Sequence, residues 1–322
     1  MLRLACRRQV RLQDLQALPC EASTSLRTLH YYAISPAPSS LRKAEKARLL
    51  SPLRCAPSFH RSIHTESNFA DVGIVGGGVV GLALASSLAV SKAFQSSSAS
   101  IALIEGTSLG KAREWAKTKQ DGSGGAISDW ENRVIYLTEE NRQWLDEIGV
   151  TPYLLPARLG PVHRMHVTDG VTGAALDFDT PDPSSKRLGT MVEISNLQQA
   201  LLQKLTGLDI AKERVQVLDS SRVGSIEADG EGDSGTTLDS WPVLHYSSDK
   251  TPLKTRLLVG ADGNNSPVRK YAGIKATGWE YGRIGVVATM KIRADALEER
   301  TAYQRFLPTG TIAWLPVSVV TP

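Results

Sequence analysis

The stretch "DVGIVGGGVVGLALASSLAV" at residues 71–90 decides the fold of this 322-residue chain. It opens on five residues of strand character, turns through glycines and continues as a run of small and branched apolar residues typical of a buried helix. A polar, serine-rich loop follows, and "IALIE" at residues 101–105 is a second apolar strand that ends in an acid. Strand, helix and strand in this order predict a βαβ unit, and therefore an α/β fold.

The glycine segment fits the pattern G-x-G-x-x-G through Gly76, Gly77, Gly78 and Gly81. Here Gly76 permits a tight turn, Gly78 lets the backbone approach a pyrophosphate, and Gly81 lets helix and strand pack closely. Glu105 closes the second strand, where an acid can bond the ribose hydroxyls of a dinucleotide. A glycine turn of any α/β protein is the alternative. The strand and helix around the glycines favour dinucleotide binding.

A second motif, "LLVGADGNNSPVRK", occupies residues 257–270. Its apolar start predicts a buried parallel strand, which places Asp262 and Gly263 at the carboxyl end, where α/β sheets bind ligands. An ordinary Asp-Gly turn is one alternative. Another is a glycosylation acceptor, because Asn264-Asn265-Ser266 fits N-x-S.

The charge is unevenly distributed along the chain. Residues 1–65 hold 11 Lys and Arg against 3 Asp and Glu, whereas residues 66–322 hold 26 against 30. A mildly acidic remainder argues against nucleic acid as a partner, which requires a concentrated basic face. In residues 1–65 serine and arginine are interleaved, and four arginines share one side of a possible helix: Arg3, Arg7, Arg8 and Arg11. This pattern predicts a mitochondrial transit peptide, with a disordered basic arm as the alternative.

Residues 1–65, here called the leader, also contain every cysteine of the chain: Cys6, Cys20 and Cys55. Removal of the leader would therefore leave no cysteine for a disulfide, a zinc site or a nucleophile. His163 and His166 stand three residues apart but have no third ligand nearby, so we predict no metal site. Asp177 and Asp179 would share one face of a strand, and a solvated sheet face is favoured over an acid/base pair.

Further along the chain, strand and helix patterns alternate. "NRVIYLTEENRQWLDEIGV" at residues 132–150 predicts a helix, and residues 160–180 predict an antiparallel meander around "DG" and "TG" turns. "NLQQALLQKL" at residues 196–205 predicts an amphipathic helix, and strand character dominates from Ile284 onward. This order predicts a doubly wound, Rossmann-like nucleotide domain interleaved with an antiparallel sheet.

Together the two motifs resemble the FAD-dependent aromatic hydroxylases, which pair G-x-G-x-x-G with an A-D-G-x-x-S-x-V-R segment. "MHVTDG" at residues 165–170 and "TAYQRFLPTGTIAWLP" at 301–316 are similar to the ubiquinone-biosynthesis branch of that family. The resemblance implies FAD as the cofactor, with Asp262 and Gly263 contacting the flavin. "NRVIYLT" places Arg133 at the position of the family's arginine that faces the flavin.

The resemblance also implies a domain plan. Residues 1–65 would be the transit peptide, residues 66–158 and 190–275 the FAD-binding segments, and residues 159–189 and 276–322 the β segments of the substrate domain. The family's third motif, Gly-Asp-Ala followed by a small residue and His, does not occur in the sequence. We therefore expect a chain that is incomplete at its C-terminus relative to the family.

The implied activity is hydroxylation of the ring of a polyprenylated phenol, at the C5 position in the mitochondrial branch, through a C4a-hydroperoxyflavin formed with O2. No side chain is required as a nucleophile, so no catalytic residue is assigned. Electrons would come from NAD(P)H or from a ferredoxin and its reductase, on the matrix side of the mitochondrial inner membrane, beside other quinone-biosynthesis proteins. The alternatives are a catalytically incomplete partner in a quinone-synthesis complex, and a flavin epoxidase or reductase.

Overall fold

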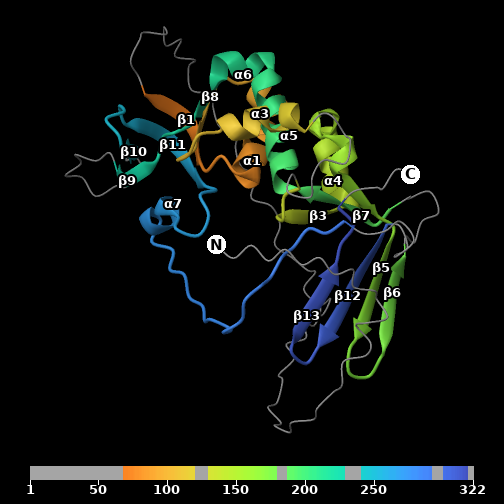
Figure 1. Ribbon diagram of the computed structural model, residues 1–322. Helices are drawn as coiled ribbons and strands as arrows, with labels where there is room; N and C mark the ends of the chain where they lie inside the picture. Colours follow the sequence, from red (N-terminus) through yellow and green to blue (C-terminus); the bar gives the residue numbers. More distant parts are fainter. Residues whose placement is uncertain (1–67, 120–129, 180–186, 229–240, 292–299, 318–322) are drawn as a thin grey trace, which may run out of the picture. The chain divides into compact units, whose positions relative to one another are not determined.

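The computed structural model describes residues 68–119, 130–179, 187–228, 241–291 and 300–317 (Figure 1). The predicted transit peptide at residues 1–65 lies outside the described residues. Every helix in the described part of the chain is too short or too polar to span a bilayer.

A six-stranded sheet carries the first motif and the second motif side by side. Its strands run in the order β8-β2-β1-β11-β10-β9, and the first four are mutually parallel, whereas β10 and β9 are antiparallel additions. The non-sequential order requires crossover connections, as predicted for an α/β fold. The strand bounds are β1 Phe69–Val75, β2 Ile101–Ile104, β8 Val215–Leu218, β9 Val223–Ala228, β10 Pro242–Tyr246 and β11 Leu253–Gly260.

Alternate residues of the sheet enter two separate apolar cores. Ile74 and Leu103 belong to the core that includes α1 and α5, while Val75 and Ile104 belong to a second core on the other face. This alternation follows from the two-residue period of a strand. The α/β fold class predicted from the sequence is therefore confirmed. The helix bounds are α1 Val79–Val90, α2 Lys92–Gln95, α3 Gly110–Thr118, α4 Glu139–Glu147, α5 Ile194–Gly207, α6 Asp209–Arg214 and α7 Pro267–Tyr271.

Two smaller sheets come from the remaining strands. A three-stranded antiparallel sheet has the order β3-β7-β4, and a four-stranded sheet has the order β13-β12-β5-β6, in which only β5 and β12 are parallel. Strand β7 spans the predicted boundary at residue 190, and the domain plan stays a prediction. The bounds are β3 Val134–Thr138, β4 Leu159–Val162, β5 Arg164–Asp169, β6 Ala175–Asp179, β7 Gly189–Glu193, β12 Thr301–Leu307 and β13 Gly310–Trp314.

Two local expectations differ from the structure. The helix predicted over residues 132–150 is wrong in its first part, because Val134–Thr138 is strand β3 and the helix begins only at Glu139. The β-branched and aromatic residues of β3 favour a strand, and Thr138 caps the helix by accepting a hydrogen bond from the Asn141 amide at 3.3 Å. Residues 284–291 form no strand, and the Val286 side chain is 90% exposed.

The core around α5 should dominate stability. Leu201 of α5 is completely buried, whereas Leu176 of β6 is 64% exposed. We expect Leu201→Ala to lower the free energy of unfolding by about 2–5 kcal/mol, because it removes apolar contacts and leaves a cavity. Leu176→Ala, the matched control, should cost less than about 1 kcal/mol. Urea denaturation of the full chain followed by circular dichroism measures both, and an equal loss at the two positions would contradict this packing.

Candidate cofactor site

Except for Arg133, the predicted site residues lie where three parallel strands end together. Val75, the last residue of β1, is in register with Ile104 of β2 and with Gly260 of β11. The glycine segment, Glu105 and the Asp262 turn follow directly after these strand ends. The carboxyl edge of a parallel sheet is where α/β folds bind ligands, so the topology gathers both motifs at the expected edge.

The glycine segment contacts both neighbouring elements at very short range. Gly76 has a φ of +115°, and a Cβ built there would lie 2.2 Å from the carbonyl oxygen of Ala261. A Cβ on Gly81 would lie 1.9 Å from the carbonyl oxygen of Gly76. Hence any side chain at either position would collide with backbone. The tight turn and close helix packing predicted for these two glycines are what the local geometry requires.

Gly78 has a different environment. It is the N-cap of α1 with φ −72°, and a Cβ built there would meet no atom within 4 Å. No side chain caps the start of α1, and no acidic residue stands in its first turn. Open space over the N-terminal amides of a helix suits an anion, because the amides and the positive end of the dipole both face it.

Glu105 borders the glycine segment on the β2 side. Its Oε2 accepts a hydrogen bond from the Gly77 amide at 2.7 Å, and its Oε1 accepts from the amide and the hydroxyl of Thr107 at 2.8 and 2.7 Å. These three bonds fix the carboxylate at the carboxyl edge of the sheet. A carboxylate retains further acceptor capacity in this arrangement, so it can also accept from ribose hydroxyls.

The Asp262 turn borders the glycine segment on the β11 side. The Asp262 amide nitrogen would lie 2.9 Å from a Cβ on Gly76, which shows how closely the two motifs meet. Gly263 has a φ of +78°, in the region that favours glycine. The Asp262 carboxylate accepts a hydrogen bond from the Val268 amide at 3.3 Å, and the Ser266 hydroxyl caps α7. This Asp-Gly turn is thus built against the first motif.

The Arg133 backbone is linked to the glycine segment through helix α5. Its carbonyl oxygen accepts a hydrogen bond from the Ile194 amide, at the first residue of α5, at 3.1 Å. One turn further along α5, the Gln198 side chain donates to the carbonyl oxygen of Gly77 at 2.8 Å. The Arg133 side chain is 73% exposed and forms an ion pair with Glu131 at 2.9 Å. The N-terminal turn of α5 therefore connects Arg133 to the glycine segment.

Several residues around the N-terminal turn of α5 could not be predicted from the motifs. Glu193 ends the otherwise uncharged strand β7, and its side chain is only 1% exposed. It pairs with Arg158, whose guanidinium carbon lies 4.3 Å from the ring centre of Trp130. An acid inside a run of buried strand residues signals a buried ion pair, because an unpaired charge there would be too costly. Gln198 carried no comparable signal.

His163 and His166 are the two histidines for which the sequence predicts no metal site. Among the residues that the structure describes, no cluster of three or more His, Cys, Asp or Glu could hold a metal ion. The Nδ1 atom of His166 instead lies 2.7 Å from Oδ1 of Asp177, on the four-stranded sheet. The His166 hydrogen bond holds the pKa of Asp177 below its usual range, with help from Arg164. Asp177 thus belongs to a surface ion-pair group.

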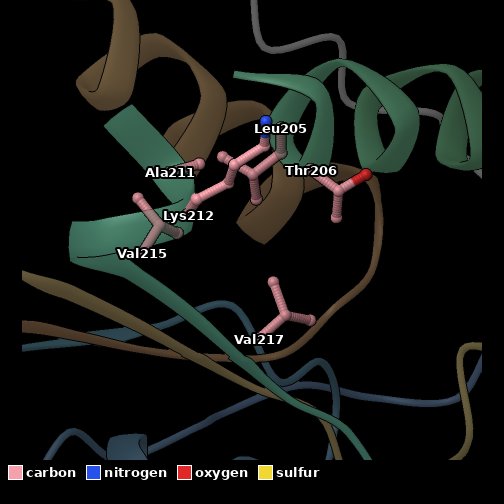
Figure 2. Close-up of a pocket in the computed structure, with 6 residues that line it drawn as sticks. All are labelled: Leu205, Thr206, Ala211, Lys212, Val215 and Val217. Carbon is pink, nitrogen blue, oxygen red and sulfur yellow. The ribbon is translucent and has the colours of Figure 1, made fainter. Parts of the chain in front are cut away.

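A cleft of about 230 Å³ lies at the other end of α5 (Figure 2). Lys212 stands in its wall and forms an ion pair with Asp209 at 2.9 Å. Apart from Lys212 and the Thr206 hydroxyl, the wall is aliphatic, so it has little to offer a dinucleotide. The lining residues are Leu205, Thr206, Ala211, Lys212, Val215 and Val217. The motif residues lie elsewhere, at the N-terminal turns of α1 and α5.

Two glycine-to-alanine substitutions in the glycine segment should differ in their effect on stability, because the space around the two glycines differs. Gly81→Ala places a methyl group against backbone that cannot move aside, so we expect the free energy of unfolding to fall by about 1–3 kcal/mol. Gly78→Ala places it in open space, and the weaker N-cap should cost less than about 1 kcal/mol. Thermal unfolding of both variants measures the difference. Equal destabilisation would show that the segment is not packed in this way.

The curated relatives of this chain carry the same protein name in distant organisms. The chain is 35% identical over 249 residues to the mitochondrial ubiquinone biosynthesis monooxygenase COQ6 of Saccharomyces cerevisiae, covering 77% of this chain and 47% of that protein. It is 32% identical over 249 residues to the Homo sapiens protein of the same name, covering 77% and 48%. The predicted resemblance to the ubiquinone-biosynthesis branch is confirmed. The chain spans about half the length of these curated relatives.

Among solved structures, the crystal structure of pqsL, a probable FAD-dependent monooxygenase from Pseudomonas aeruginosa, matches with a TM-score of 0.47 and 18% identity. The match covers 66% of this chain and 48% of that one. A family model described as FAD binding domain matches residues 137–317, which is more than half of the chain and begins after the glycine segment. The chain therefore belongs to the FAD binding domain family, whose cofactor is FAD.

Proposed function

We propose that this chain holds FAD for a monooxygenase that hydroxylates the ring of a polyprenylated phenol in ubiquinone biosynthesis. The observation that carries the proposal is the meeting of Gly76, Glu105 and Asp262 at three adjacent strand ends. The relatives named as ubiquinone biosynthesis monooxygenases supply the reaction class. Because the chain spans about half of their length, the activity of the whole protein is part of the proposal.

The residues at the strand ends fit FAD. The open space over Gly78 and the first amides of α1 would take the pyrophosphate, and Glu105 would accept hydrogen bonds from the ribose. Arg133, Asp262 and Gly263 would lie toward the flavin ring. When bound and reduced, FAD supplies the activation of O2, while these residues bind it, orient it and set the local charge.

The remaining parts of the proposal concern location and partners. Residues 1–65 act as a transit peptide, and the enzyme works peripherally on the matrix side of the inner membrane, where a polyprenylated phenol partitions. Electrons come from NAD(P)H or from a ferredoxin and its reductase, and other quinone-biosynthesis proteins bind the enzyme. The interleaved serine and arginine of the leader, and the mitochondrial names of the relatives, support the location.

The first test is FAD binding by the full chain. We expect unchanged protein to take up FAD, and Gly78→Ala to weaken binding at least tenfold, or about 1.4 kcal/mol, because its methyl group fills the space meant for the pyrophosphate. Flavin fluorescence titration gives both dissociation constants. Gly278→Ala is the matched control, since it also adds a methyl group in open space.

Failure of the unchanged chain to bind FAD would refute the proposed role. The reaction class is tested separately, with FAD-loaded protein, a reductant, O2 and a short-chain prenylated phenol. A product with one oxygen added to the ring supports the hydroxylase. Oxygen added across a prenyl double bond, or a reduced product, would point to an epoxidase or a reductase instead. FAD uptake without any product would favour the alternative of a catalytically incomplete partner in a quinone-synthesis complex.

The location is tested with the leader alone. We expect residues 1–65 to carry a fluorescent protein into mitochondria, because the arginines would form one positively charged helix face. Replacing Arg3, Arg7, Arg8 and Arg11 with alanine should abolish import, whereas replacing Arg42 and Arg48 should reduce it less. Microscopy with a mitochondrial dye gives the answer. Diffuse fluorescence from the unaltered leader would contradict the proposed location.

A further inference from the structure

A buried ion pair lies beneath the N-terminus of α5. Arg158 Nη1 donates to both carboxylate oxygens of Glu193, at 3.0 and 3.1 Å, and the two side chains are 8% and 1% exposed. The Trp130 ring covers the guanidinium at 4.3 Å. Separating two charges buried to this extent would leave each of them desolvated without a partner, so the pair has a fixed geometry.

Glu193 occupies the N-cap position of α5 but does not cap that helix with its side chain. Its Oε1 instead accepts a hydrogen bond from the backbone amide of Glu131 at 2.7 Å. Glu131 performs the capping from outside the helix, because its Oε2 accepts from the Ser195 amide at 2.9 Å. A carboxylate at this end of a helix is stabilised by the unpaired amides and by the dipole.

The other oxygen of Glu131 is used by Arg133. Glu131 Oε1 accepts hydrogen bonds from Nε and Nη2 of the Arg133 guanidinium, at 3.0 and 2.9 Å. The Glu131 side chain is 18% exposed and the Arg133 side chain 73%. One carboxylate thus joins a fixed helix end to an outward-facing guanidinium, which would otherwise sample many rotamers.

We propose that Glu131 is a positioning residue, which holds the Arg133 guanidinium toward FAD while the Arg158–Glu193 pair holds the Glu131 backbone. The inference rests on the proposed function, because it takes FAD as the ligand of the strand ends. Its geometric support is independent of the family: the same helix turn that Glu131 caps also places Gln198 against the Gly77 carbonyl at 2.8 Å.

A double-mutant cycle on the full chain tests this role. Glu131→Gln keeps an acceptor for the Ser195 amide but removes the charge that holds Arg133, and Arg133→Met removes the guanidinium. We expect each single substitution to weaken FAD binding five- to tenfold in fluorescence titrations at low salt. The double variant should bind no more weakly than Arg133→Met alone, because Glu131 acts through Arg133. Glu139→Gln, which weakens the ion pairs of Glu139 with Arg142 and Arg187 away from the glycine segment, is the matched control.

A purely structural role gives a different pattern. Glu131→Gln would then weaken binding by the same factor with or without Arg133, and that result would overturn the inference, as would unchanged binding in Glu131→Gln. If Glu131→Gln does not fold, Arg133→Lys carries the test, because it leaves the α5 cap intact but cannot reproduce the two-nitrogen contact. Wild-type affinity in that variant would also overturn it.

The cycle separates this inference from the proposed function. If the unchanged chain takes up no FAD, both fail together. If the unchanged chain binds FAD and Gly78→Ala weakens that binding, the FAD site stands, and a null result at Glu131 removes only the positioning role. Thermal unfolding measures the stability of each variant independently of FAD binding. Arg133→Met should leave stability unchanged, whereas Glu131→Gln should lower it because the cap of α5 is weaker.

Discussion

The close approach of three backbone segments at the carboxyl edge of the six-stranded sheet is the constraint on which the site depends. The turn after β1, the first turn of α1 and the turn after β11 meet at distances that leave no room for a Cβ on Gly76 or Gly81. Parallel pairing of β1 with both β2 and β11 brings these segments into register. Glycine is therefore a packing requirement here before it is a binding device.

Helix α5 extends this constraint to a second part of the fold. It follows directly after β7 of the three-stranded sheet, packs its leucines into the same core as α1, and contacts the glycine segment through Gln198. A displacement of β7 would therefore shift the N-terminus of α5 against Gly77. The buried Arg158–Glu193 pair resists such a displacement, because moving either charge away from its partner leaves the other desolvated and alone.

The parts that could be predicted from the sequence are those with a local physical signature. The βαβ unit followed from the apolar runs and the glycines, and the Asp262 turn from its position after a strand. The helix pattern predicted over residues 132–150 rests on the apolar residues Leu137, Trp144, Leu145 and Ile148, of which Leu137 lies in strand β3. The β-branched and aromatic residues of Val134–Thr138 favour a strand instead. The contact of Gln198 with Gly77 spans 121 positions and has no local signature.

Charge placement around α5 shows why such contacts escape a reading of the sequence. Glu131 and Arg133 stand two residues apart in the chain, which by itself suggests an exposed local ion pair worth little. Their significance comes from Glu193, 62 positions away, whose buried carboxylate receives the Glu131 amide. Because the Glu131 carboxylate also caps α5, the pair is attached to the rigid core rather than to a mobile loop. A surface arginine that is bonded to a fixed carboxylate keeps its guanidinium in one direction. An arginine that contacts only water does not.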